Sequence, residues 1–350
     1  MSDLGTLGGT NSSGNAINAA GQVVGYAYTT GNATRHACVY SNSKMNDLNS
    51  FLDASGAGWI LQTAQGINDK GQITGTGTVN GATHAFLLTP ITPRFDLNGD
   101  GHADIVFQSQ SNGSVPYETL NGVTPASFGY LFGGVAGDYK VAALADLNGD
   151  GKPDVLFQSP SSGRVVYGLM NGLTPTGVYG YLFPNPLPAG YVVAGNPDLN
   201  GDGKPDILFQ NQSTGDIAYT FLNGVIPGAS GYLFRGLDPN LKLVGTPDLN
   251  GDGHPDLLFE NMKTGDVVYA LLNGTTTLTP TSYGTLFQKI PLEYQIVGTP
   301  DLNADGFEDI VFQGQTNGDV SYVLLNNLTV TGSGYLFRGI STDYKIVGIH

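Results

Sequence analysis

The sequence contains little cysteine and few basic residues, and each shortage excludes a class of protein. The single cysteine, Cys38, rules out an intramolecular disulfide. Only 14 basic residues stand against 29 acidic ones, and no basic stripe is present that could bind nucleic-acid phosphates. No apolar run has the length of a membrane span, and the start MSDLGTLGG lacks the basic and apolar regions of a signal peptide. We therefore predict no nucleic-acid partner and no membrane span, and secretion has to be inferred from other features.

Recognisable catalytic motifs are also missing. The five histidines do not cluster in sequence, and neither Gly-x-Ser-x-Gly nor His-Glu-x-x-His occurs. We expect His36 and His84 to lie in strands with hydrogen-bonded rings. The sequence therefore predicts no independent enzyme.

Glycine and aromatic residues are abundant. The 350 residues include 52 Gly, 18 Tyr and 16 Phe, while charged residues make up only 12%. No stretch reads as a helix of useful length. This composition predicts a turn-rich, all-β protein.

The most informative stretch is the nine-residue loop from Asp198 to Asp206, DLNGDGKPD. It places oxygen-bearing side chains at positions 1, 3, 5 and 9, which is the alternating spacing of loops that wrap calcium. Position 7 would supply a backbone carbonyl, and Gly203 at position 6 suits the positive φ of a sharp turn. Position 12 is Phe209, so the loop lacks the terminal glutamate of the helix-loop-helix calcium site and leads into a strand.

This loop occurs five times, starting at Asp96, Asp146, Asp198, Asp248 and Asp301. Three carboxylates held close together repel one another unless a cation is present, so we predict five calcium ions; the alternative is a set of Asx-rich turns that bind nothing. The predicted ligands at positions 1, 3, 5, 7 and 9 are Asp96, Asn98, Asp100, His102 and Asp104; Asp146, Asn148, Asp150, Lys152 and Asp154; Asp198, Asn200, Asp202, Lys204 and Asp206; Asp248, Asn250, Asp252, His254 and Asp256; and Asp301, Asn303, Asp305, Phe307 and Asp309.

The loops also explain the acidity of the chain. Three Asp residues in each of five loops make up fifteen of the 29 acids, and five calcium ions would change the net charge from −15 to about −5. Short loops of this kind bind calcium weakly, in the millimolar range found outside cells. We therefore expect an extracellular or cell-surface location.

The residues after each loop keep a fixed register. Counted from the first Asp, Phe lies at +11, Gly at +17, Tyr at +21 and Asn at +25 in all five copies, and length varies only beyond that. In the copy that starts at Asp146, strands are expected at Val155–Phe157, Arg164–Met170, Gly180–Phe183 and Tyr191–Ala194. Four strands in 50 residues predict the blades of a β-propeller, with the repeated Phe and Tyr filling the interfaces between blades.

The first 90 residues carry a second, sparser repeat. Residues 16–25, AINAAGQVVG, return as residues 66–75, GINDKGQITG, and a His-Ala strand follows each copy at His36 and His84. Because Ala19 and Ala20 stand where a metal loop would need acids, we predict no calcium there.

Two families resemble these repeats. The run DLNGDGKPDILFQ, followed by a Tyr strand and LNG, resembles the FG-GAP or VCBS repeat over residues 92–350, and the N-terminal units resemble the HAF repeat of secreted bacterial proteins. The first resemblance implies calcium-bound propeller blades of cell-surface, adhesive and lectin-like proteins, or accessory domains of polysaccharide-degrading enzymes. Many relatives have Trp where this chain has Tyr at +21, and the single Trp59 weakens the lectin interpretation.

The repeats give two possible blade counts. The preferred arrangement is a seven-bladed propeller in which two HAF-like blades, residues 1–90, continue into five calcium blades, residues 91–350. The alternative is a five-bladed ring, closed by the C-terminal strand, with an N-terminal β appendage.

The predicted function is a secreted or cell-surface, calcium-stabilised binding or adhesion module. Its partner is expected to be a glycan or a surface protein, and self-association is open. The alternatives are a structural propeller used for assembly and an accessory domain of a polysaccharide-active enzyme.

Overall fold

The protein consists almost entirely of antiparallel strands. The computed structural model describes residues 2–19, 21–41, 44–52, 56–68, 71–89, 95–272, 278–303 and 305–347. Within these ranges the helices are two short 3-10 turns, Thr30–Asn32 and Leu48–Phe51, and neither could cross a membrane. The chain divides into two compact units, residues 1–91 and 92–350. The all-β prediction is confirmed.

The first unit contains two small sheets with a common core. The strands of the first sheet are β1 Gly8–Ile17, β2 Val23–Thr29, β3 Arg35–Ser41 and β4 Lys44–Asp47. Those of the second are β5 Trp59–Ile67, β6 Ile73–Val79 and β7 Ala82–Leu88. Val24, Val39 and Leu48 pack with Leu61 and Phe86 in one buried cluster, so each sheet covers the apolar face of the other.

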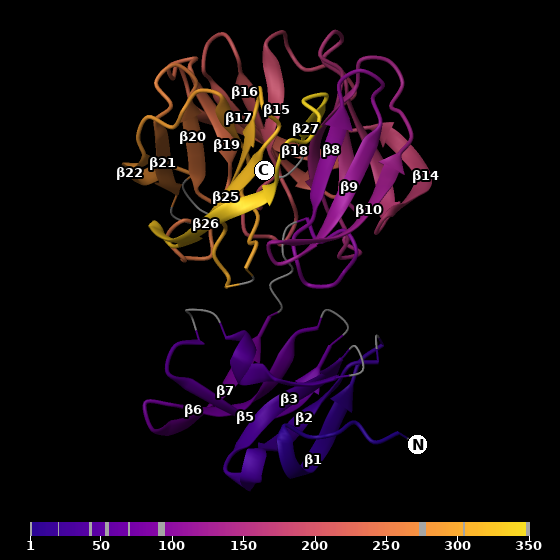
Figure 1. The fold of residues 1–350 in the computed structure, drawn as a ribbon, viewed down its shortest axis with the longest axis vertical. Helices are drawn as coiled ribbons and strands as arrows, with labels where there is room; N and C mark the ends of the chain where they lie inside the picture. The colour runs from indigo at the N-terminus through magenta and orange to yellow at the C-terminus, as the bar shows by residue number, and fades with distance from the viewer. Residues whose placement is uncertain are drawn as a thin grey trace. The chain divides into compact units, whose positions relative to one another are not determined.

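The second unit contains five four-stranded sheets, which we call blades 1 to 5 (Figure 1). Blade 1 combines β8 Ile105–Ser109, β9 Val115–Asn121 and β10 Thr124–Phe132 with β27 Tyr344–Ile346. Blade 2 has β11 Lys140–Ala145, β12 Asp154–Gln158, β13 Val165–Asn171 and β14 Thr174–Tyr181. Blade 3 has β15 Tyr191–Gly195, β16 Ile207–Asn211, β17 Ile217–Asn223 and β18 Ile226–Phe234. Blade 4 has β19 Leu241–Gly245, β20 Leu257–Asn261, β21 Val267–Leu272 and β22 Pro280–Phe287. Blade 5 has β23 Tyr294–Gly298, β24 Ile310–Gly314, β25 Val320–Asn326 and β26 Thr329–Phe337.

The first strands of the blades line the centre of this unit. Strand β11 contacts β15, β15 contacts β19, and β19 contacts β23. Each blade therefore runs outward from its first strand to its fourth, which is the arrangement of a β-propeller.

Phenylalanine pairs join every blade to the next. The Phe at +11 is buried in all five blades, and its ring lies edge to face or tilted against a Phe at the end of the fourth strand of the preceding blade or just after it. The pairs are Phe132 with Phe157, Phe183 with Phe209, Phe234 with Phe259, Phe287 with Phe312, and Phe337 with Phe107. The prediction that these residues fill the blade interfaces is confirmed for Phe.

The repeated Tyr at +21 has a different place. It packs over the Gly of the Gly-x-Leu-Phe motif on the fourth strand of its own blade, so a Cβ at Gly231, for example, would lie 2.6 Å from Tyr219 Oη. The glycine is needed because the tyrosine ring occupies the space that a side chain would take. The Tyr therefore contributes to packing within a blade.

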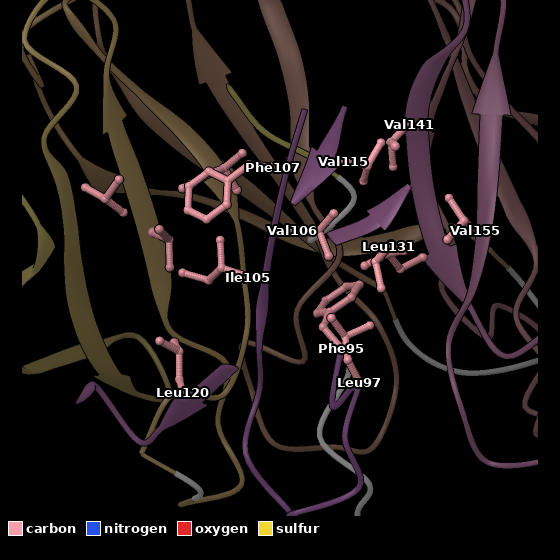
Figure 2. Close-up of a cluster of buried hydrophobic side chains, with 14 of the residues drawn as sticks. Phe95, Leu97, Ile105, Val106, Phe107, Val115, Leu120, Leu131, Val141 and Val155 are labelled. Carbon is pink, nitrogen blue, oxygen red and sulfur yellow. The ribbon is translucent and has the colours of Figure 1, made fainter. Parts of the chain in front are cut away.

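The ring closes between blade 5 and blade 1. Strand β27, from the C-terminus, pairs with β8 in antiparallel register, Ile346 opposite Phe107, and the Phe337 and Phe107 rings are 6.0 Å apart. One buried cluster combines Ile105 and Val106 of blade 1 with residues of blades 2 and 5, among them Val155 and Val311 (Figure 2). The strand pairing thus gives the five-bladed alternative. The preferred expectation of seven blades in one ring is corrected, because blade 5 contacts blade 1 directly.

A buried side chain at +12 bonds each blade to the first strand of the following one. We call this side chain, with its donor and its acceptor bond, the clamp of the blade. These residues are Gln108, Gln158, Gln210, Glu260 and Gln313. Gln108 Nε2 donates to Tyr139 O at 3.1 Å, and Gln108 Oε1 accepts from Val141 N at 3.0 Å. Gln313 makes the same two bonds to Tyr344 and Ile346 of β27, at 2.8 and 3.0 Å. The clamp therefore also closes the ring.

Blade 4 is the exception, because its clamp is Glu260. Glu260 Oε2 accepts from Ile296 N at 2.9 Å, but an ionised carboxylate cannot make the donor half of the clamp. Burial raises the pKa of Glu260 above its ordinary value, which means that the fold favours the protonated acid.

We expect Glu260→Gln to stabilise the protein at neutral pH by about 1–3 kcal/mol, because glutamine restores the missing donor in a buried site. A raised folded-state pKa makes wild type lose stability as pH rises through that pKa. The advantage of the variant should thus be full above the folded pKa and vanish below the unfolded one. Urea unfolding across the pH range measures it, with Gln210→Glu as the matched reverse variant; a gain that does not change with pH would contradict this account.

Candidate functional site

The five predicted loops occupy equivalent places in the five blades. In blades 2 to 5 the loop connects the first strand to the second, and in blade 1 it precedes β8, whose inner neighbour is β27. Because the blades share one strand order, the loops share one end of the propeller. The structure therefore brings the 25 predicted residues into five separate, repeated sites and not into one centre.

Each loop is organised around its first Asp. In the loop of blade 3, Asp198 Oδ1 accepts from Gly201 N at 2.8 Å and from Asp202 N at 3.1 Å, and Asp198 Oδ2 accepts from Gly203 N at 2.7 Å. Gly203 has φ +79°, so the positive φ predicted at position 6 is confirmed. Equivalent bonds to the Asp at position 1 occur in the other four loops; in blade 5, position 4 lies outside the described residues.

Positions 3 and 5 continue the same network. Asn200 Oδ1 accepts from Asp202 N at 2.9 Å, Asn200 Nδ2 donates to Asp202 Oδ2 at 3.3 Å, and Asp202 Oδ1 accepts from Lys204 N at 3.0 Å. Asp202 is exposed and Asn200 is half-buried. The turn is thus folded by its own side chains, and the carboxylate of Asp202 remains at the surface, where a cation can reach it.

Position 9 has a role that sequence reasoning missed. The Asp there is fully buried in every loop and ties the loop to the third strand of its blade. Asp206 Oδ2 accepts from Leu199 N at 3.0 Å, and Asp206 Oδ1 accepts from Leu222 N at 2.8 Å. Asp104, Asp154, Asp256 and Asp309 make the same two bonds. This carboxylate is therefore a structural cross-link, whether or not it also binds an ion.

The three carboxylates of a loop influence one another. Burial raises the pKa of Asp104, Asp256 and Asp309 to about 7 and that of Asp154 and Asp206 to about 6; backbone N–H groups oppose the shift, and the Asp residues at positions 1 and 5 add to it. A cation at the loop would lower the pKa of the Asp at position 9 and so oppose the effect of the other two carboxylates.

The chemistry of the donors fits a hard cation, since each loop offers carboxylate and amide oxygens and no soft ligand. In the described parts of the chain, however, no group of three or more His, Cys, Asp or Glu side chains is placed to hold a metal ion. Calcium binding therefore stays a prediction.

The residues at position 7 were predicted to act through their carbonyls, and their side chains differ. Lys204 Nζ donates to Asn223 Oδ1 at 2.6 Å, and Lys152 contacts Asn171 in the same way. Phe307 is buried. In blades 2 and 3 the side chain at this position thus helps to attach the loop to the third strand of its own blade.

The structure also reveals a row of exposed aromatic side chains that the sequence analysis did not single out. They lie on the fourth strands, in or next to the Gly-Tyr-Leu-Phe motif, and are 46% to 65% exposed. They are Phe128, Tyr130, Tyr179, Tyr181, Tyr232, Tyr283 and Tyr335. The motif itself was visible in sequence, but its Tyr could not be distinguished from the packed Tyr at +21 until the strand register was known.

Arginine side chains accompany three of these tyrosines. The guanidinium carbon lies 4.8 Å from the ring centroid for Arg164 over Tyr181, and 3.8 Å for Arg235 over Tyr232 and for Arg338 over Tyr335. Among the described residues the ion pair within 4.0 Å is that of His36 with Asp47. These arginines therefore stack on tyrosine without an acidic partner.

In the N-terminal unit, the two repeated turns are held by a side-chain pair. Asn18 Oδ1 accepts from Gln22 N at 3.0 Å, and Asn68 Oδ1 accepts from Gln72 N at 2.9 Å. His36 and His84 lie in β3 and β7 as predicted, and the His36 ring is 2.6 Å from Asp47 Oδ2. These polar groups close hairpins and support strands.

Comparison with known proteins gives one family and several distant structures. The FG-GAP-like repeat family matches residues 96–157 and 146–209. A crystal structure of a nidogen/laminin complex is similar at 11% identity, covering 70% of this chain and 96% of that one, with a TM-score of 0.41. An auxiliary nutrient binding protein from Bacteroides thetaiotaomicron VPI-5482 is similar at 8% identity, covering 76% of each chain, with a TM-score of 0.31. No curated protein matches the chain. The resemblance to FG-GAP repeats is thus confirmed for two copies, while the HAF resemblance stays a prediction.

Proposed function

We propose that this protein is a calcium-stabilised binding module, outside the cell or on its surface, whose ligand is a glycan. The observation that carries the proposal is the row of exposed tyrosines on the outer strands. An exposed aromatic ring offers an apolar face together with a polar hydroxyl, and the apolar C–H face and the hydroxyls of a sugar ring match both. A non-catalytic role agrees with the separation of the polar groups into five equivalent loops.

Calcium would serve stability and not ligand chemistry. The oxygens that would hold it are those of positions 1, 3 and 5, with the carbonyl at position 7 and the buried Asp at position 9. Its charge would offset the repulsion among three carboxylates in each loop. The FG-GAP-like repeat, the acidity and the weak calcium affinity expected of such loops all favour an extracellular or cell-surface location.

A glycan array tests the binding function. We expect the full chain to bind a restricted set of glycans in 1 mM calcium. The triple variant Tyr181→Ala, Tyr232→Ala and Tyr335→Ala should lose most of that binding while its melting temperature stays within about 2 °C of wild type, because exposed residues contribute little to stability. Leu292→Ala, an exposed apolar residue that lies outside the fourth strands, is the matched control.

Three other outcomes would favour a different site or a different function. Binding that survives the loss of all three tyrosines would place the glycan site outside the outer strands. Ordered self-association without glycan binding would favour the structural propeller, and activity that depends on a fused polysaccharide-active enzyme would favour the accessory domain.

A further inference from the structure

Blade 2 departs from the other blades on the face that it turns toward blade 1. Strand register places Val166 opposite Tyr181 and opposite Phe157, and the Phe157 ring contacts Phe132 of blade 1. Tyr179 lies two residues from Tyr181 on β14, and alternate residues of a strand share one face. Arg164 directly precedes β13, and its guanidinium lies over the Tyr181 ring. Arg164 and these aromatic rings therefore lie on a common surface.

This surface contains a cavity of about 440 Å³, a size typical of small-ligand sites. Five aromatic residues from both blades line it: Phe132, Tyr139, Phe157, Tyr179 and Tyr181. Gly134, Val135 and Ala136 complete the wall on the blade 1 side. The small side chains of this connection leave the space open.

Two tyrosine side chains meet across the corresponding face of blade 3. Tyr191 and Tyr232 occupy the places of Tyr139 and Tyr181, and their hydroxyl oxygens are 3.5 Å apart. Strand position +18 also differs. In blades 3 to 5 it is an aspartate, such as Asp216, whose Oδ1 accepts from Gly236 N at 2.7 Å. In blade 2 it is Arg164, so the charge at this position is reversed.

Arg164 retains free hydrogen-bonding capacity. Its Nη1 donates to Pro184 O at a long 3.4 Å, and its guanidinium stacks on Tyr181. No described acid lies within ion-pair distance of it. The acid of the adjoining connection, Asp138, accepts instead from Ser159 Oγ at 2.7 Å and from Ser161 N at 2.8 Å. A stacked guanidinium presents its N–H edge outward, where it can bind a carboxylate through two bonds.

We infer that the groove between blades 1 and 2 binds the acidic sugar of a glycan, a uronate, with the sugar face on Tyr179 and Tyr181 and its carboxylate on Arg164. Tyr179 and Tyr181 are more than half exposed, so their hydroxyls can reach the hydroxyls of a bound sugar. This inference rests on the proposed glycan-binding function and adds the chemical class of the sugar and the blade that selects it.

Titration calorimetry of the full chain with a trimer of galacturonic acid, and with the uncharged trimer of galactose, tests this. We expect the acidic trimer to bind at least about 10-fold more tightly, and Arg164→Gln to abolish that preference, since one charge-assisted pair is worth this much. Ala136→Leu should weaken both trimers by filling the cavity. Arg235→Gln, the same stack in blade 3, is the control and should change neither.

The result that overturns the inference is acidic-trimer binding that Arg164→Gln leaves unchanged, or equal binding of the two trimers. Benzoate bound in an Arg164-dependent manner without trimer binding would also overturn it, because the groove would then be an aromatic-acid site. Failure of every glycan on the array would overturn the proposed function as well. Thermal melting of Arg164→Gln separates lost binding from lost folding.

Discussion

In excess chelator, Asp206→Ala is expected to unfold at clearly lower denaturant concentration than wild type, whereas Asp202→Ala is expected to unfold at nearly the same concentration. Both residues belong to the same predicted calcium loop, but their contacts differ. Asp206 is fully buried and accepts from Leu199 N and Leu222 N. Removing it leaves two buried N–H groups without partners, at about 1–3 kcal/mol each. The loss should be about 2–6 kcal/mol.

Asp202 is the matched control within the same loop. It is exposed and its Oδ1 accepts from Lys204 N, a bond that water can replace. Its loss also removes one of three mutually repelling carboxylates, which offsets the lost bond. Urea unfolding of the two variants, with and without calcium, separates the structural Asp from the one that acts only through an ion. Equal destabilisation of both variants in chelator would contradict the assignment of position 9 as the cross-link.

The sequence predicted the blades well because the repeat carries its own register. The fixed spacing of Phe and Gly predicted the strands, and the apolar run Val155–Phe157 predicted a strand covered on both faces, which the burial of its residues confirms. The preferred blade count was wrong because it included the N-terminal unit as two blades of the ring. A shared 50-residue period favoured one ring, but the period of a repeat does not say which strands pair.

The contacts that close the ring could not be predicted from the sequence, although the residues that make them are repeated. Gln108 and Gln313 occupy equivalent positions of the repeat. Each stabilises the fold through a bond across a blade interface, to Val141 and to Ile346 of the C-terminal strand respectively. Likewise, Tyr181 and Tyr167 are both repeated tyrosines. Strand register makes one exposed and packs the other over Gly180. Long-range pairing decides both cases, and local pattern does not contain it.

The predicted calcium site illustrates a different limit. Oxygen spacing predicts which side chains can converge on an ion, but in the described parts of the chain no three His, Cys, Asp or Glu side chains are placed to hold one. The same Asp and Asn oxygens can instead accept backbone N–H groups of their own turn, as Asp198 does from Gly201 and Gly203. An Asx-rich turn and a calcium loop therefore share much of their geometry, and an ion-dependent measurement is needed to separate them.

Removal of calcium is expected to lower the melting temperature by on the order of 10 °C. An ion that binds only the folded state adds RT ln(1 + [L]/Kd) to stability, so a loop with Kd of ~0.1–1 mM gains roughly 0.4–1.4 kcal/mol in ~1 mM calcium. Five loops then contribute on the order of 2–7 kcal/mol, against a total stability of ~5–15 kcal/mol. Each kcal/mol shifts the melting temperature of a domain of this size by about 2–4 °C.

Calorimetry with and without excess chelator measures this effect, and the loops should contribute separately because each lies in its own blade. Asp202→Ala should remove about a fifth of the calcium-dependent gain and leave the other four loops intact. Magnesium should restore little of the loss, since it requires a tighter octahedron and keeps its waters. If the melting curve is the same in chelator and in calcium, the five loops are Asx turns closed by their own N–H bonds. The stability of the ring then rests on contacts that need no ion, among them the phenylalanine pairs, the Gln clamps and the buried Asp at position 9.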